Sequence, residues 1–128
     1  MFPITSLYAG LLAVLLVGLS AKVIMGRRRA RALIGDMGDK ALFQAIRVHG
    51  NFTEYTPFAL LLIALCEGQG APTWSLHLLG SALVIGRVLH VLGFGRDPQI
   101  IVLRQIGMVS TFAVLVLAGV GLIIQALV

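Results

Sequence analysis

The sequence of 128 residues is short of charge, because Asp, Glu, Lys and Arg make up only 12% of it. Ordinary globular domains contain about 25% charged residues and about 45 to 50% apolar ones. Here 59% of the residues are hydrophobic. The single cysteine, Cys66, excludes an intramolecular disulfide. These shortages exclude an ordinary soluble domain and indicate an integral membrane protein.

Two common kinds of functional site are also missing. The three histidines and one cysteine are scattered along the chain, without the spacing of metal ligands. The stretch GDMGD at residues 35–39 lacks the Lys-Ser/Thr ending of a phosphate-binding loop, and no strand precedes it. The sequence therefore predicts neither a metal site nor a nucleotide site.

Long apolar runs dominate what is present. A helix needs about 20 residues to cross about 30 Å of hydrocarbon. The runs show no period-two alternation, and four strands could not close a barrel. We therefore predict an all-α integral membrane protein, a single four-transmembrane-helix bundle over residues 1–128. Its helices are expected at about residues 4–25, 41–66, 73–93 and 104–128.

The basic residues are sorted by loop. Arg96 lies between the third and fourth runs, whereas EGQGAPT, between the second and third, has no basic residue. Because Lys and Arg accumulate in cytoplasmic loops, both termini are predicted to face outward, and the first and third loops to face the cytoplasm. The net charge of +5 thus reflects topology and not a nucleic-acid partner. The basic residues between the first two runs are Arg27, Arg28, Arg29, Arg31 and Lys40.

A polar stripe interrupts the second run. Its members fall at positions i, i+4, i+7 and i+8 of one helix, so they share a face. Gln44 extends this face by about one turn toward the cytoplasmic end. An arginine and an acid in the membrane together cost about 5 to 7 kcal/mol, so the stripe must face protein or a wet cavity. The members are Arg47, Asn51, Glu54 and Tyr55.

Two interpretations of the stripe stay open on this evidence. Arg47 and Glu54 can pair with neighbouring helices as interior polar contacts. Alternatively, the stripe belongs to a ligand cleft, because Pro57 bends the helix beside it and further cations gather at the same end of the predicted bundle. Such a cleft suits a ligand with more carboxylates than amines. The further cations are Arg27, Arg28, Arg87 and Arg104.

These residues resemble a known family, the membrane-associated proteins in eicosanoid and glutathione metabolism (MAPEG). The hallmark of its second helix is R-x-x-x-N-x-x-E-Y-x-P. This chain has the same residues at the same spacing from Arg47 to Pro57. The run G-R-V-x-H, which contains Arg87 and His90, is similar to the third helix of the prostaglandin synthase members. The resemblance covers nearly the whole chain.

The resemblance implies a homotrimer that binds glutathione between adjacent subunits, near the cytoplasmic face. It implies a transferase or peroxidase acting on lipophilic electrophiles or hydroperoxides that arrive from the lipid. Arg104 is the candidate catalytic residue, because a guanidinium near a thiol lowers the thiol pKa from about 8.5 and favours the reactive thiolate. The glutathione-binding residues that it implies are Arg27, Arg47, Asn51, Glu54, Tyr55, Arg87 and His90.

One position departs from the family pattern. Four residues past His90, where the enzymes commonly carry a tyrosine, this chain has Phe94, which cannot donate a hydrogen bond. A membrane protein that binds glutathione or a lipid without turnover is therefore an alternative.

A small multidrug-type transporter is a third interpretation. Those transporters carry a buried glutamate for cationic drugs on the first helix, where this chain has no acid.

Overall fold

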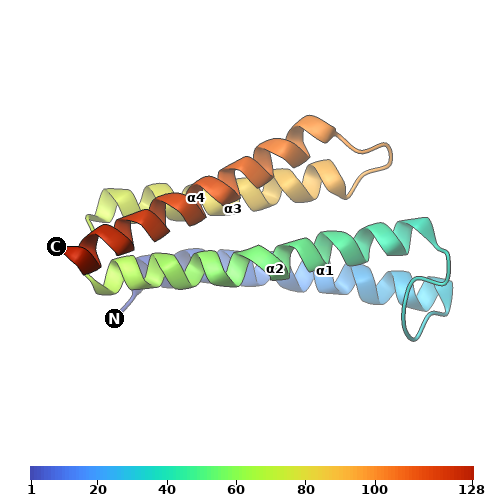
Figure 1. Cartoon of the computed structure of the whole chain (residues 1–128). Helices are drawn as coiled ribbons and strands as arrows, with labels where there is room; N and C mark the ends of the chain where they lie inside the picture. Colours follow the sequence, from blue (N-terminus) through green and yellow to red (C-terminus); the bar gives the residue numbers. More distant parts are fainter.

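The computed structural model describes all 128 residues and contains four α-helices and no strands. The helices run alternately up and down as two hairpins, α1–α2 and α3–α4, which pack against each other (Figure 1). The predicted all-α four-helix architecture is confirmed. The helices are α1 (Pro3–Ala30), α2 (Lys40–Gly68), α3 (Thr73–Phe94) and α4 (Ile101–Leu127).

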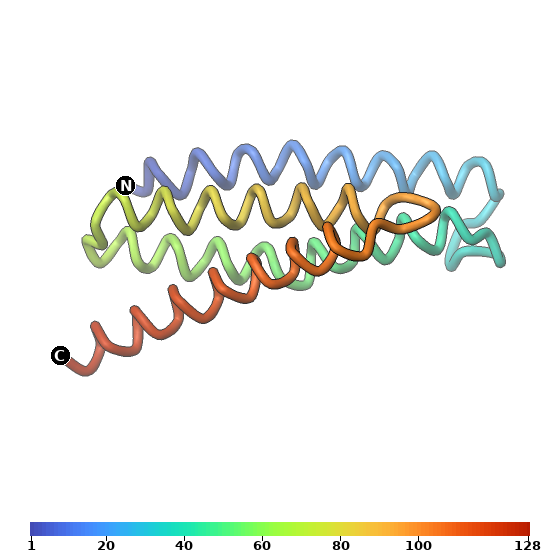
Figure 2. The backbone as a smooth tube through the Cα atoms, turned by 90° about the horizontal axis from the view of Figure 1, so that it is seen from above, coloured from blue at the N-terminus to red at the C-terminus, as the bar shows by residue number.

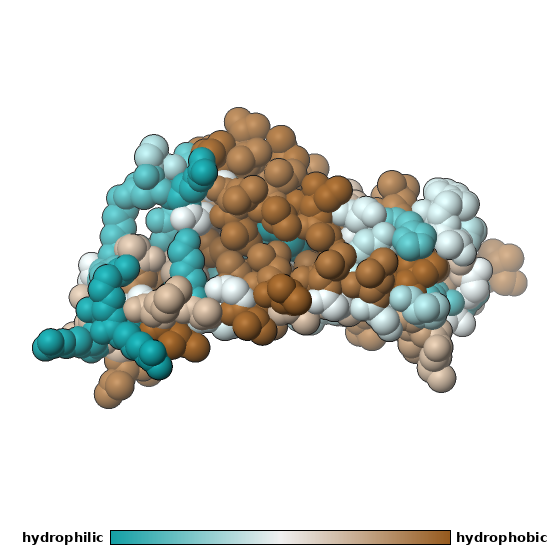
Figure 3. All heavy atoms as spheres, turned by 180° about the vertical axis from the view of Figure 1, so that it is seen from behind, coloured by the Kyte–Doolittle hydropathy of each residue, from teal (hydrophilic) through white to brown (hydrophobic).

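The two ends of the bundle differ in chemistry. One end holds both termini and the α2–α3 loop, and we call it the terminal end (Figure 1). The other holds the α1–α2 loop and the α3–α4 loop with most of the basic residues, and we call it the basic end. Hydrophilic side chains gather at the basic end, while hydrophobic ones cover the middle of the molecule (Figure 3).

The surface of the bundle is suited to lipid. Helices α1, α3 and α4 are long and apolar enough to cross a membrane. Helix α2, with 29 residues, matches them in length, but its polar stripe interrupts the apolar run. Only 24 of the 128 residues are buried, and large apolar side chains are exposed along every helix. In water so much exposed apolar surface would drive association.

Helix α1 extends five residues beyond its predicted end at residue 25 and finishes at Ala30. Its last turn is basic, and cations there interact favourably with the carbonyl end of the helix dipole. Arg31 ends the helix in the left-handed conformation, with φ of 52°. The backbone N–H of Ala32 then donates to the carbonyl of Arg27 at 2.9 Å, which closes the helix end.

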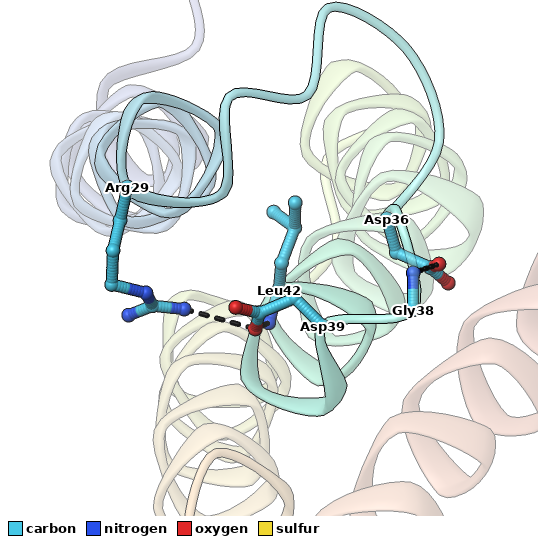
Figure 4. A network of polar contacts seen from close by, with 5 residues as sticks. All are labelled: Arg29, Asp36, Gly38, Asp39 and Leu42. Carbon is cyan, nitrogen blue, oxygen red and sulfur yellow. Dashed lines mark hydrogen bonds and ion pairs between the residues drawn. The ribbon is translucent and has the colours of Figure 1, made fainter.

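Helix α2 begins with a side-chain cap. Oδ1 of Asp39 accepts a hydrogen bond from the backbone N–H of Leu42 at 2.8 Å and pairs with Arg29 at 3.0 Å (Figure 4). In the same loop, Oδ1 of Asp36 accepts from the N–H of Gly38 at 2.8 Å. The hydrogen bond from Leu42, together with the charge of Arg29, lowers the pKa of the Asp39 carboxyl from its usual 3.8.

Helices α3 and α4 approach each other most closely near the basic end. A Cβ added at Gly107 would collide with the carbonyl oxygen of Gly86 and the backbone nitrogen of His90, so only glycine fits there. Oγ of Ser110 donates to the carbonyl of Ala82 at 2.8 Å across the same interface. Toward its C-terminus α4 swings away from the bundle, and it does not contact α1 (Figure 2).

Polar side chains at the terminal end are matched within the chain. The hydroxyl of Tyr8 lies 2.8 Å from Nδ1 of His77 and 3.0 Å from Oγ of Ser81, which joins α1 to α3. Oε2 of Glu67 accepts hydrogen bonds from the backbone N–H and the hydroxyl of Thr5, at 2.7 and 2.6 Å. The end of α2 thereby caps the start of α1.

Candidate functional site

The polar stripe of α2 carries an ion pair on its surface. Nη2 of Arg47 and Oε1 of Glu54 are 3.5 Å apart, and their side chains are 44% and 50% exposed. Gly50 lies between them, and a Cβ added there would come within 3.2 Å of Nη1 of Arg47. Because glycine has no side chain, the guanidinium can cross the helix surface to a carboxylate two turns away. The half-exposed pair lies in the middle part of α2.

Asn51, one turn beyond Arg47, connects this stripe to α3. Its Oδ1 accepts a hydrogen bond of 2.6 Å from Nη2 of Arg87. Arg87 is fully buried, and its other partner is Sδ of Met108, 3.9 Å from Nη1. Nε of Arg87 has no hydrogen-bond partner in the chain. A buried guanidinium with only neutral partners leaves uncompensated positive charge beneath the stripe.

Tyr55 extends the stripe toward α4. Its ring packs edge-on against the ring of Phe112, with the centroids 5.5 Å apart. Its hydroxyl makes no hydrogen bond to the rest of the chain, whereas the hydroxyl of Tyr8 at the terminal end makes several. The Tyr55 hydroxyl is therefore free to bind a group from outside the subunit.

His90, Phe94 and Arg104 form a stack where α3 meets α4. The rings of His90 and Phe94 are 5.5 Å apart in an edge-on arrangement. Cζ of Arg104 lies 4.0 Å from the centre of the Phe94 ring, a cation–π contact, and its Nη1 donates to Oε1 of Gln99 at 3.0 Å. His90 is buried, and its Nδ1 has no hydrogen-bond partner.

Two residues that the sequence placed near the stripe have other neighbours in one subunit. Nη1 of Arg27 donates to the carbonyl of Gly35 in the α1–α2 loop at 2.6 Å, and nothing within the chain joins it to the stripe. Nε2 of Gln44 donates to the carbonyls of Phe94 and Arg96. Gln44 therefore holds the α3–α4 loop to α2 through its side chain, and its position on the face of the stripe stays a prediction.

The stripe faces outward from the subunit instead of lining an enclosed pocket. The stripe, Arg87, His90 and Arg104 are absent from the linings of five hollows on the surface of the chain. Next to it, α4 carries a shallow apolar hollow lined by Val109, Phe112 and neighbouring residues. A ligand on this open face needs a second surface to enclose it.

The comparisons with known proteins extend over almost the whole chain. The model of the MAPEG family matches residues 5–124. The chain belongs to the MAPEG family. It is similar to the inner membrane protein YecN of Escherichia coli strain K12 and to the protein of that name from strain O6:H1. Each is 40% identical over 114 residues, which cover 89% of this chain and 86% of the relative. No solved structure matches the chain.

With this family and its apolar helices, the chain is an integral membrane protein. Asn51 and Arg87, which lie on different helices, meet directly in the fold. Sequence reasoning missed Gly50, which gives Arg47 its path to Glu54. A glycine between two opposite charges on one helix face is the signal that would have identified it.

Proposed function

We propose that this MAPEG protein binds glutathione on the open face of α2 and joins it through its sulfur to lipophilic electrophiles, or uses it to reduce hydroperoxides. The observation that carries the proposal is the 2.6 Å contact between Arg87 and Asn51, directly beneath the half-exposed pair of Arg47 and Glu54. It places an excess of positive charge next to one accessible carboxylate.

The charges of glutathione suit this arrangement. The tripeptide has two carboxylates, one ammonium group and a thiol. Guanidinium groups bind carboxylates through paired hydrogen bonds, so Arg47 can take one carboxylate while Glu54 takes the ammonium group. The free hydroxyl of Tyr55 and the amide of Asn51 supply neutral contacts. Arg87 and His90, both buried, support the ligand from the inner side, Arg87 through Asn51.

Arg104 is the proposed catalytic residue. Its guanidinium stabilises the glutathione thiolate, which attacks an electrophilic carbon as the leaving group departs with its electron pair. With a hydroperoxide, the thiolate attacks the terminal oxygen, the O–O bond breaks to leave a sulfenic acid, and the departing alkoxide takes up the proton that the thiol lost and leaves as an alcohol. A second glutathione then converts the sulfenic acid to the disulfide and water. Either lipophilic substrate reaches the site from the membrane.

A homotrimer would enclose the site. A charged pair exposed to lipid costs about 5 to 7 kcal/mol on the insertion scale, and a neighbouring subunit that covers α2 removes this cost. The apolar hollow beside Phe112 on α4 would be covered by the same neighbour. A neighbour is also the one source from which Arg27 can join the ligand, because Arg27 of the same subunit contacts its own loop.

We further propose that the protein lies in a bacterial inner membrane with both termini outward and the site on the cytoplasmic side. The last turn of α1 and the loops of the basic end hold Arg28, Arg29, Arg31 and Arg96, and basic segments of this kind face the cytoplasm. The name of the two Escherichia coli relatives is in line with the inner membrane.

Phe94 favours a second candidate function, glutathione or lipid binding without turnover. Its ring lies against Arg104, at the position where family enzymes commonly carry a tyrosine. The phenyl ring cannot donate a hydrogen bond to a ligand, so binding can persist while catalysis is lost.

Calorimetric titration of the purified protein with glutathione tests the proposal. Arg47→Ala is expected to abolish binding while the oligomer persists, and Arg96→Ala, which removes a charge from the exposed α3–α4 loop, is the matched control. Unchanged affinity in Arg47→Ala would contradict the site. Activity with glutathione plus a chloronitrobenzene or a lipid hydroperoxide separates the two candidates, since binding without turnover selects the second.

A further inference from the structure

Four arginines lie at the end of α1, and only two of them are engaged by the chain. Arg29 pairs with Asp39 at 3.0 Å, and Arg27 donates to the carbonyl of Gly35 at 2.6 Å. The side chains of Arg28 and Arg31 make no hydrogen bond or ion pair within the chain. Two guanidinium groups are therefore available to an external anion.

The two free arginines border one hollow, which we call the arginine hollow. It has a volume of about 380 Å³, and none of the stripe residues of α2 lines it. The left-handed turn at Arg31 and the bond from Ala32 to Arg27 fix its backbone. Ala32 is buried, so the hollow has a packed floor. Its lining consists of Ile24, Arg27, Arg28, Arg31, Ala32 and Leu33.

Two of the lining residues, Ile24 and Leu33, are large and apolar, and the loop that follows exposes two more apolar side chains. Leu33 is fully exposed, and Ile34 and Met37 in the same loop are 85% and 73% exposed. Ile24, on the membrane side of the hollow, is 51% exposed. A loop in water gains nothing from three such residues, whereas a loop at the membrane interface can insert them among acyl chains. This apolar rim distinguishes the hollow from a site for a soluble anion.

From these observations we infer that the arginine hollow binds the headgroup of an anionic phospholipid. Arg28 and Arg31 bind the phosphate through charge-assisted hydrogen bonds, and one acyl chain runs along Ile24 and Leu33 toward the hydrocarbon. Arg27, which also lines the hollow, is a proposed glutathione contact, but the phosphate contacts of this inference, Arg28 and Arg31, are not, so the inference does not depend on the proposed glutathione site.

Native mass spectrometry of the full-length protein with phosphatidylglycerol and phosphatidylcholine of identical acyl chains tests the inference. The wild type is expected to retain phosphatidylglycerol preferentially. In the double variant Arg28→Gln/Arg31→Gln the preference should fall about 25-fold, since each arginine near an anionic surface contributes about fivefold. Leu33→Ser should weaken retention of both lipids, because it removes the apolar rim without disturbing the core.

Two matched controls remove the same charge elsewhere at the basic end. Arg29→Gln removes an arginine that already has Asp39 as a partner, and Arg96→Gln removes one from the other loop. Both should keep the lipid preference. An equal loss in the controls, or wild-type retention in the double variant, would overturn the inference. So would displacement of the lipid by millimolar phosphate or by glutathione, which would assign the hollow to a soluble anion.

Discussion

The two ends of this bundle differ in whether their polar side chains have partners within the chain. At the terminal end, the hydroxyl of Tyr8 and the carboxylate of Glu67 each have partners on another helix of the same chain. Toward the basic end, Arg87 is buried with only neutral partners, and Arg47 and Glu54 are half exposed. The first group holds the helices together, and the second leaves charge that the chain alone does not satisfy.

The difference shows how structural polar groups can be separated from functional ones in a membrane protein. An unsatisfied polar group in hydrocarbon is costly, so a chain retains it only where something outside the chain can match it. Tyr8 and Tyr55 illustrate the point, since the hydroxyl of Tyr8 is fully engaged and that of Tyr55 is free. The predictions below test this separation.

The largest effect on glutathione affinity is expected when one of the two glutamates of α2 is replaced by glutamine, and the other serves as the comparison. Glu54→Gln should weaken glutathione binding about 100-fold or more, because an ammonium group loses its carboxylate partner, and should leave thermal stability unchanged. Glu67→Gln should do the reverse, lowering the unfolding temperature without changing affinity, because it weakens the cap of α1. Titration calorimetry and thermal unfolding in detergent measure both quantities. Equal effects of the two variants would abolish the distinction between the ends.

Arg87→Met should cost about tenfold in glutathione affinity, because Asn51 loses the charged donor that fixes its amide. The fold should survive, since an apolar side chain of similar length removes an uncompensated buried charge. Calorimetry and size-exclusion chromatography of the variant provide the readouts. A destabilised variant with normal affinity would place Arg87 among the structural residues.

Substitutions of Gly50 should lower glutathione affinity by a smaller amount, which increases with the size of the new side chain. Gly50→Leu would push the guanidinium of Arg47 off the helix surface and lower affinity about fivefold. Gly50→Ala should be tolerated, because its Cβ needs only a slight shift of a flexible side-chain end and alanine favours the helix by about 0.5 to 1 kcal/mol. If both variants bind like the wild type, the path of Arg47 over Gly50 has no role in binding.

Tyr8→Phe removes the hydroxyl that joins α1 to α3 at the terminal end. We expect about 1 kcal/mol lower stability and unchanged glutathione affinity. Chemical unfolding followed by tryptophan fluorescence measures the stability. A change in affinity would show that the terminal end communicates with the site.

The smallest expected effect is the pH dependence of the unfolding temperature that comes from Asp39 at the basic end. The lowered pKa of Asp39 means that its cap stabilises the protein above pH 3.8, the usual pKa of the group, and that this contribution disappears as the pH falls through the lowered value. The unfolding temperature of Asp39→Ala should therefore lie below that of the wild type at pH 7, and the two should converge in acid. A constant difference would exclude the charged cap.

The fold and the α2 stripe were predictable because they depend on periodicity. Apolar runs of about 20 residues define the helices, and positions i, i+4 and i+7 define the face of Arg47, Asn51 and Glu54. The extra turns of α1 were not predictable from hydropathy, because its last residues are basic and are stabilised by the helix dipole.

Contacts between helices were harder to predict. Arg87 reaches Asn51 because α3 and α4 pack closely at Gly86 and Gly107, which fixes how α3 lies in the bundle. Gln44 lies on the expected helix, but its long side chain turns to the carbonyls of the α3–α4 loop. The hydrogen-bond partners of such side chains depend on which backbone groups are left without partners after the helices pack. The sequence pattern does not contain this information.

In the proposed homotrimer, the half-exposed pair on α2 links the stability of the protein to its abundance. If the proposed neighbour covers Arg47 and Glu54, a single subunit is less favourable in lipid than the trimer, and mass action makes the folded population rise with the number of copies in the membrane. We expect sparse, newly inserted chains to be the ones that membrane proteases remove, and crowded ones to persist.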